Sequence, residues 1–113
     1  MFLAIRETRF AKRIARQVLK SHSAISANNP ELSGESLYRE VLVHTGLVDS
    51  SRVDEILWQA EDSIDEWTTH SNKGLGLRHV AHFVVVWKYR AAGSLGSVVS
   101  FKNIVYSLIP SDL

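Results

Sequence analysis

His79 and His82 are the only two of the five histidines that lie close together in the sequence. A spacing of three places both imidazoles on one face of a helix, where they can supply two ligands to a metal ion. A third ligand must come from elsewhere, because residues 70–113 contain a single carboxylate side chain, that of Asp112. The pair is a weak metal candidate, and the simpler interpretation is two polar positions at the edge of a buried helix. We expect no resident metal or cofactor.

A polar stripe runs along the same segment. Arg78, His82 and Tyr89 stand at positions i, i+4 and i+11, roughly in line on a helix that is otherwise apolar. Such a stripe is suited to lining a small pocket for an anion. The alternative is that it forms the solvent-facing edge of the helix.

Motifs typical of catalysis are missing from the sequence. It has no cysteine, no G-x-S-x-G nucleophile motif and no glycine-rich phosphate-binding pattern. Carboxylate pairs at i, i+4, such as Glu61 with Asp65, lack the Glu-x-x-His pattern of di-iron bundles. These observations favour a protein that is not an enzyme.

Charge is strongly segregated along the chain, although the formal net charge is only +1. Residues 1–22 carry six basic and one acidic side chain, residues 49–69 carry seven acidic and one basic, and residues 70–113 carry five basic and one acidic. Two interpretations follow. The basic and acidic faces pair with each other, within one molecule or in a homodimer, or one of them is free to bind a partner of opposite charge.

The basic residues of the N-terminal segment gather on one face of the predicted helix. At about 100° per residue they fall within an arc of roughly 120°, with apolar residues opposite. Six cations on one face are enough to contact several phosphates, which makes nucleic-acid binding an alternative function. The residues are Arg6, Arg9, Lys12, Arg13, Arg16 and Lys20.

Trp58 is the most unusual residue of the acidic segment. The apolar stripe of this segment is formed by Val53, Leu57, Ala60, Ile64 and Trp67, and Trp58 projects away from it, onto the acidic side. Exposed tryptophans are favoured anchors of protein interfaces, although another helix or the 21–33 segment could cover this one. The predicted partner-binding surface consists of Trp58, Asp54, Glu61, Asp62 and Asp65.

The elements that carry these residues are predicted to be helices. Apolar spacing, Gly46 as a C-terminal stop and Ser33 and Ser51 as N-caps give five helices. Residues 21–33, with Asn28-Asn29-Pro30, are predicted to be a loop, residues 93–96 a turn, and residues 77–92 the central buried element. A β-hairpin over residues 80–109 is the alternative, because Val84-Val85-Val86 favours a strand. The five predicted helices cover residues 2–22, 34–45, 51–69, 77–92 and 97–108.

Length and composition complete the expectation. The 113 residues are 45% hydrophobic, which suits one helical domain over residues 1–113 with its own core. The longest strongly apolar run, residues 80–87, is far shorter than the roughly 20 residues that cross a bilayer, so we expect a soluble, cytoplasmic protein without a membrane partner. The predicted function is a non-enzymatic protein-interaction or regulatory module, with self-association as one form of it. Nucleic-acid binding is the first alternative, and metal or ligand binding through His79 and His82 is the second.

Overall fold

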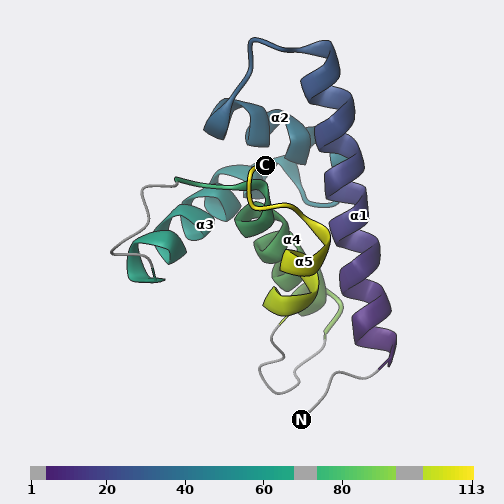
Figure 1. The fold of residues 1–113 in the computed structure, drawn as a ribbon. Helices are drawn as coiled ribbons and strands as arrows, with labels where there is room; N and C mark the ends of the chain where they lie inside the picture. The colour runs from purple at the N-terminus through teal and green to yellow at the C-terminus, as the bar shows by residue number, and fades with distance from the viewer. Residues whose placement is uncertain (1–4, 68–73, 94–100) are drawn as a thin grey trace.

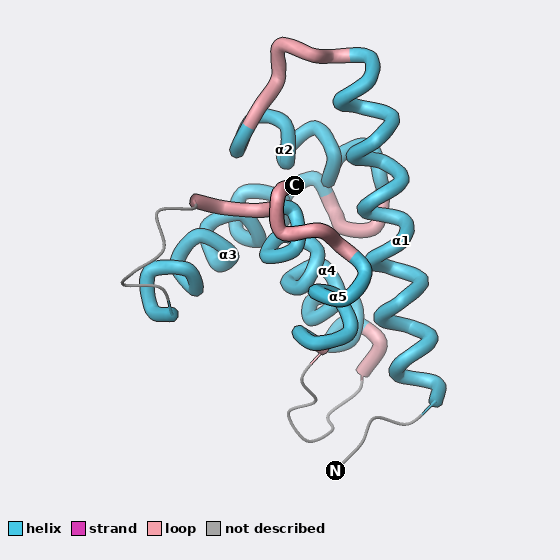
Figure 2. The backbone as a smooth tube through the Cα atoms, viewed as in Figure 1, coloured by secondary structure: helices cyan, strands magenta, loops and turns pink. Residues whose placement is uncertain are grey.

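The protein is an all-α bundle (Figure 1). The computed structural model describes residues 5–67, 74–93 and 101–113, with the backbone alone for residues 65–67. The helices are α1 (Ile5–Asn28), α2 (Gly34–Thr45), α3 (Val53–Trp67), α4 (Leu77–Ala91) and α5 (Lys102–Leu108), with a 3₁₀ turn, η1 (Ser50–Arg52), before α3. Figure 2 shows helices and connecting loops, and no strand in the described ranges. The all-α prediction is confirmed.

The hairpin alternative for residues 80–109 is wrong for the residues that can be checked. The valine run lies inside α4, where Val84 and Val85 are fully buried. Packing on several sides stabilises the helix there more than the intrinsic preference of valine for strands disfavours it. The predicted turn at 93–96 and the N-cap at Ser97 fall mostly outside the described residues. Only Gly93, with a φ of 78°, is seen.

Helix α1 is longer at its C-terminal end than the sequence suggested. It continues to Asn28, six residues past the predicted helix end at residue 22, so the predicted loop over residues 21–33 is wrong up to residue 28. Ser21 and His22 are buried, and the Ser21 hydroxyl lies 3.0 Å from Nδ1 of His44 in α2. The side chains of Ser26 and Asn28 bond back to carbonyls four residues earlier. Polar residues that we read as loop formers therefore satisfy helix carbonyls instead.

The boundaries of α2 agree with the prediction. Gly46 adopts the left-handed conformation, with a φ of 64°, and its N–H donates to the carbonyl of Val43, as expected for a C-terminal glycine stop. Ser33 occupies the N-cap position, but its side chain makes no capping hydrogen bond. Its carbonyl instead accepts the hydroxyl of Ser36 at 2.8 Å.

The start of α3 differs from the prediction. Ser51 lies in η1 rather than capping the helix, and its backbone N–H donates to the side chain of Asp49. The aspartate two residues earlier therefore takes the capping role that we assigned to Ser51. The helix extends to Trp67, and the predicted last residues, 68 and 69, lie outside the described part of the chain.

Helix α4 is central, as predicted. It packs against α1, α3 and α5, and its residues Leu77, Val80, Ala81, Val84 and Val85 are buried. Tyr38 of α2 joins the segment before α4 to the residues after α5, because its hydroxyl lies within hydrogen-bonding distance of the carbonyl oxygens of Leu75 and Leu113. Among the described helices, none is both long enough and apolar enough to cross a membrane.

Candidate interaction surfaces

Trp58 stands in the middle of an acidic helix face. Its exposed fraction is 66%, whereas the α3 residues Val53, Ile56, Leu57 and Ala60 are buried against the core. On a helix surface, the nearest neighbours of a residue lie three and four positions away on either side. For Trp58 all four of these positions are acidic, and we call Trp58 together with them the acidic face. The four neighbours are Asp54, Glu55, Glu61 and Asp62.

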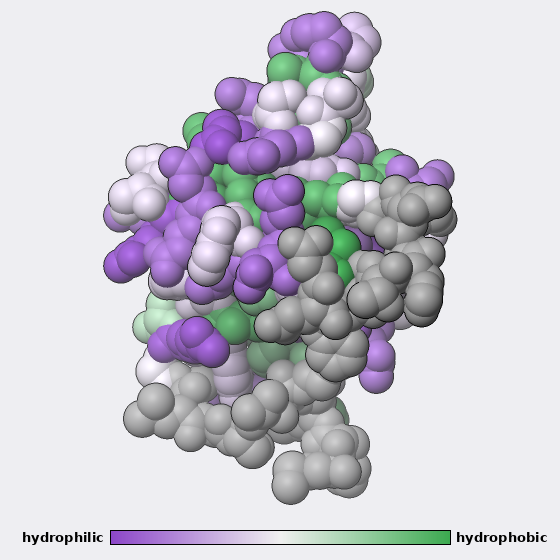
Figure 3. All heavy atoms as spheres, turned by 90° about the vertical axis from the view of Figure 1, so that its left-hand side faces the viewer, coloured by the Kyte–Doolittle hydropathy of each residue, from purple (hydrophilic) through white to green (hydrophobic). Residues whose placement is uncertain are grey.

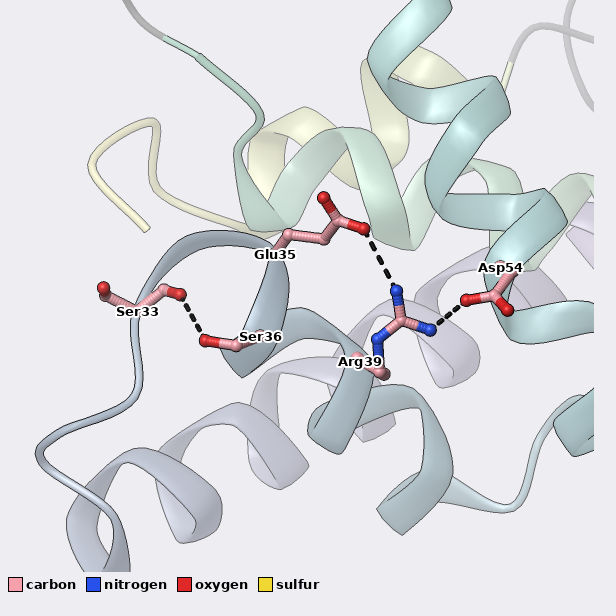
Figure 4. Close-up of polar contacts among 5 residues, drawn as sticks. All are labelled: Ser33, Glu35, Ser36, Arg39 and Asp54. Carbon is pink, nitrogen blue, oxygen red and sulfur yellow. Dashed lines mark hydrogen bonds and ion pairs between the residues drawn. The ribbon is translucent and has the colours of Figure 1, made fainter.

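The two acids at the N-terminal side of Trp58 already hold arginines. Asp54 is ion-paired with Arg39 of α2, which also contacts Glu35 at 3.0 Å (Figure 4). The hydrogen bond that Arg39 donates to Asp54 is the main cause that raises the pKa of the Arg39 guanidinium. Glu55 contacts Arg52 at 3.3 Å. These contacts pair two of the four carboxylates of the acidic face with arginines.

The two acids at the C-terminal side of Trp58 are the more available ones. Glu61 and Asp62 are both exposed, and no ion pair involves them within the described ranges. Asp65, also predicted to belong to this surface, is a residue of α3, but only its backbone is described. Figure 3 faces the side of the molecule where α3 lies, and hydrophilic residues cover most of the described surface there.

The basic residues of α1 face solvent on the side opposite the core. We call Arg6, Arg9, Arg13, Arg16 and Lys20 the basic stripe, and all five are exposed. Lys12 is half-buried and lies at the edge of the same arc. The opposite side of α1, with Ala11, Ile14, Ala15 and Val18, is buried. The stripe therefore takes no part in packing of the core.

The basic stripe and the acidic face do not pair within the molecule. None of the ion pairs between described residues joins α1 to α3, and α1 packs mainly against α2, α4 and α5. In Figure 1, α1 runs along the right-hand edge of the molecule and α3 lies to the left. The first interpretation of the charge pattern, internal pairing, is therefore wrong for a single chain in its described part.

Phe10 is a residue of this surface that we did not anticipate, because its apolar character suggested a place in the core. It is half-buried at the edge of the stripe and lines a shallow hollow of about 250 Å³ together with Arg6, Arg9 and Arg13. The Arg13 guanidinium lies 5.7 Å from the centre of its ring, and the Tyr89 ring lies 6.0 Å away on α4. Its position on the helix wheel, about 40° beyond Arg6 at the edge of the basic arc, is the signal that could have revealed it.

His79 and His82 are held by neighbours in the protein. Nδ1 of His79 accepts the backbone N–H of Gly76 at 3.0 Å, and its ring packs against that of Tyr106. His82 is half-buried beside Phe83, and burial lowers its pKa to about 4. Burial also lowers the pKa of His79. Within the described ranges, no group of three histidine, aspartate or glutamate side chains is arranged to hold a metal ion.

The three residues of the predicted polar stripe contact different parts of the protein. Arg78 lies 4.2 Å from the ring centre of Tyr106 and donates to its carbonyl oxygen at 2.8 Å. Tyr89 packs against Phe10 and Phe101, with its hydroxyl 3.5 Å from Glu7. His82 lies between Arg78 and Tyr89 in the sequence and takes part in none of these hydrogen bonds or ring contacts. The structure thus gives each member of the stripe its own partners.

Comparison with known proteins gives no further guide. No protein-family model matches the chain, and neither a curated protein nor a solved structure matches it. The two charged surfaces are therefore the features that bear on function.

Proposed function

We propose that the protein is a non-enzymatic protein-interaction module whose acidic face binds a basic segment of a protein partner. The observation that carries the proposal is Trp58, two-thirds exposed and surrounded on its helix by four acidic residues. The exposure of an indole ring to water is energetically unfavourable. Tryptophan is also among the residues that contribute most to the binding free energy when an interface covers them. A cytoplasmic location belongs to the same proposal.

The chemistry of this surface suits arginine and lysine side chains. The face of an indole attracts a cation, with a strength of about 0.5–1 kcal/mol at exposed sites and about 2 kcal/mol when water is removed. The aliphatic part of the bound side chain covers the ring, while its charged end reaches the carboxylates of Glu61 and Asp62. Trp58 then provides most of the affinity, and the carboxylates provide attraction at a distance and orientation.

A titration with a labelled arginine-rich peptide tests this proposal. Replacing Trp58 by Ala should weaken binding about tenfold, while Trp58→Phe should retain part of the affinity because it keeps an aromatic face. Glu61→Gln with Asp62→Asn should weaken binding and reduce its dependence on salt. Fluorescence anisotropy of the peptide reports all of these affinities.

The matched control removes the same charge from elsewhere on the surface. Glu31 and Glu40 are exposed residues outside α3, so Glu31→Gln with Glu40→Gln should leave peptide affinity nearly unchanged. Equal losses from the two double variants would mean that only net charge attracts the peptide. An unchanged affinity after Trp58→Ala would remove the anchor on which the proposal depends.

Self-association is one form that this function can take, because α1 of a second copy is itself a basic segment. Sedimentation velocity over a range of concentrations measures it. If copies associate through the acidic face, Trp58→Ala should shift the distribution towards the monomer, and Glu31→Gln with Glu40→Gln should not.

A further inference from the structure

We infer that the basic stripe of α1 is a second, separate binding site, which binds the phosphodiester backbone of nucleic acid without reading its sequence. Its members Arg6, Arg9, Arg13, Arg16 and Lys20 are all exposed on the side of α1 that faces away from α2, α4 and α5. At about 1.5 Å per residue they extend over about 21 Å of the helix. Duplex DNA carries one charge per about 1.7 Å of its axis, so about twelve phosphates lie along that length.

The basic stripe places like charges next to one another on α1. Like charges stand at i, i+4 in Arg9 with Arg13 and in Arg16 with Lys20, and each such pair destabilises a helix by about 0.2–0.5 kcal/mol. None of the ion pairs found between described residues involves the stripe. A polyanion neutralises this repulsion when it binds.

The N-terminal end of the stripe brings three arginines together on one helix face. Arg6, Arg9 and Arg13 line an open, mostly apolar hollow beside the ring of Phe10. Each guanidinium group can bind phosphate oxygens through two parallel hydrogen bonds. Three of them within about two turns of α1 can therefore contact neighbouring phosphates of one backbone.

Two other occupants fit the observations less well. A bilayer surface is bound by helices that insert an apolar face, but the apolar face of α1 is buried in the core, and of the described α1 residues only Ile5 is a large, exposed apolar side chain. The acidic face of a second copy offers few charges to five cations, because Asp54 and Glu55 already hold Arg39 and Arg52. A nucleic acid matches the full length of the stripe.

Salt-dependent binding to a labelled duplex of arbitrary sequence, about 20 base pairs long, tests the inference, with the single strand measured beside it. Five phosphate contacts predict a slope of log affinity against log salt of about −4.5, so a fourfold rise in salt weakens binding about 500-fold. Arg13→Gln should reduce the slope by about one unit. Arg9→Gln, Arg13→Gln and Arg16→Gln together should leave a slope of about −2.

The matched control is Arg90→Gln, which removes one exposed cation from the end of α4 and should leave the slope unchanged. Circular dichroism verifies that each variant is folded. Equal effects of Arg13→Gln and Arg90→Gln would overturn the inference in favour of net charge. Binding to vesicles of anionic lipid without binding to either nucleic acid would also overturn it. So would a natural chain that binds no nucleic acid but self-associates, if the α1 triple variant loses that self-association.

Discussion

At the scale of single residues, side chains of the same type have different roles because their surroundings differ. Trp87 is half-buried, donates from Nε1 to Gln59 at 2.9 Å and lies under the guanidinium of Arg52. Trp58 is two-thirds exposed, and among the described residues none makes a hydrogen bond or ring contact with it. The first stabilises the contact between α3 and α4, whereas the second contributes little to the fold and is available for binding.

The histidines differ in the same way, and His82 gives a prediction for pH. Burial is the main cause that lowers its pKa from 6.5 to about 4, with Lys102 and His79 acting in the same direction. The unfolded chain therefore takes up the proton first, and His82 makes stability fall as pH decreases from about 6.5 to about 4. Above that window His82 is neutral in both states and contributes no pH dependence.

The variant His82→Gln should flatten this loss. We expect it to reduce the drop in unfolding free energy between neutral pH and pH 4 by about 2 kcal/mol, less than the full shift because the side chain retains contact with solvent. Urea denaturation at a series of pH values measures it. Part of the slope should remain, because burial lowers the pKa of His22 and His79 as well. An identical pH profile for the variant and the natural chain would contradict the assignment.

At the scale of elements, local sequence patterns predict the bounds of a helix where its apolar spacing and its capping residues indicate the same ends. The apolar spacing of α2 and the glycine at position 46 predict its bounds because both signals lie within the helix itself. The end of α1 was beyond the reach of such reasoning. Ser21 and His22 are buried by contact with other helices, including a hydrogen bond to His44, which is 23 positions away from Ser21. Tertiary contact overrides local loop preference there.

Ala24→Pro tests this extension of α1 directly. In a loop a proline would be tolerated, but within a helix it removes a backbone hydrogen bond and clashes with the preceding turn, at a cost of about 3 kcal/mol. Ala24→Gly is the control, and it should cost about 1 kcal/mol. Thermal or urea unfolding distinguishes these outcomes, and a proline variant as stable as the natural chain would contradict a helix through residue 28.

The candidate surfaces were accessible to sequence reasoning to different degrees. Helix periodicity alone placed Trp58 on the acidic side and the arginines of α1 on the outer side, because both follow from about 100° per residue. It could not decide whether the two faces touch, since that depends on how α1 and α3 are arranged around α4. Nor could it place Phe10 beside the arginines, because apolar residues at the border of a helix face turn towards whichever neighbour is present.

At the scale of the whole molecule, the net charge of +1 conceals two opposed surfaces. The helices that carry the basic stripe and the acidic face, α1 and α3, both pack against α4 and lie on opposite sides of the molecule in Figure 1. Under the two proposals, this separation lets a basic protein segment and a nucleic acid bind the same molecule at once, without either partner displacing the other.

The measurement that tests this account most directly is an amide and indole NMR titration of the natural chain with each ligand in turn. The arginine-rich peptide should shift the indole signal of Trp58 and the amides around Glu61 and Asp62, and leave the stripe from Arg6 to Lys20 unchanged. The duplex should do the reverse, and the second ligand should bind as well after the first. Overlapping shifts, or displacement of one ligand by the other, would contradict two independent surfaces.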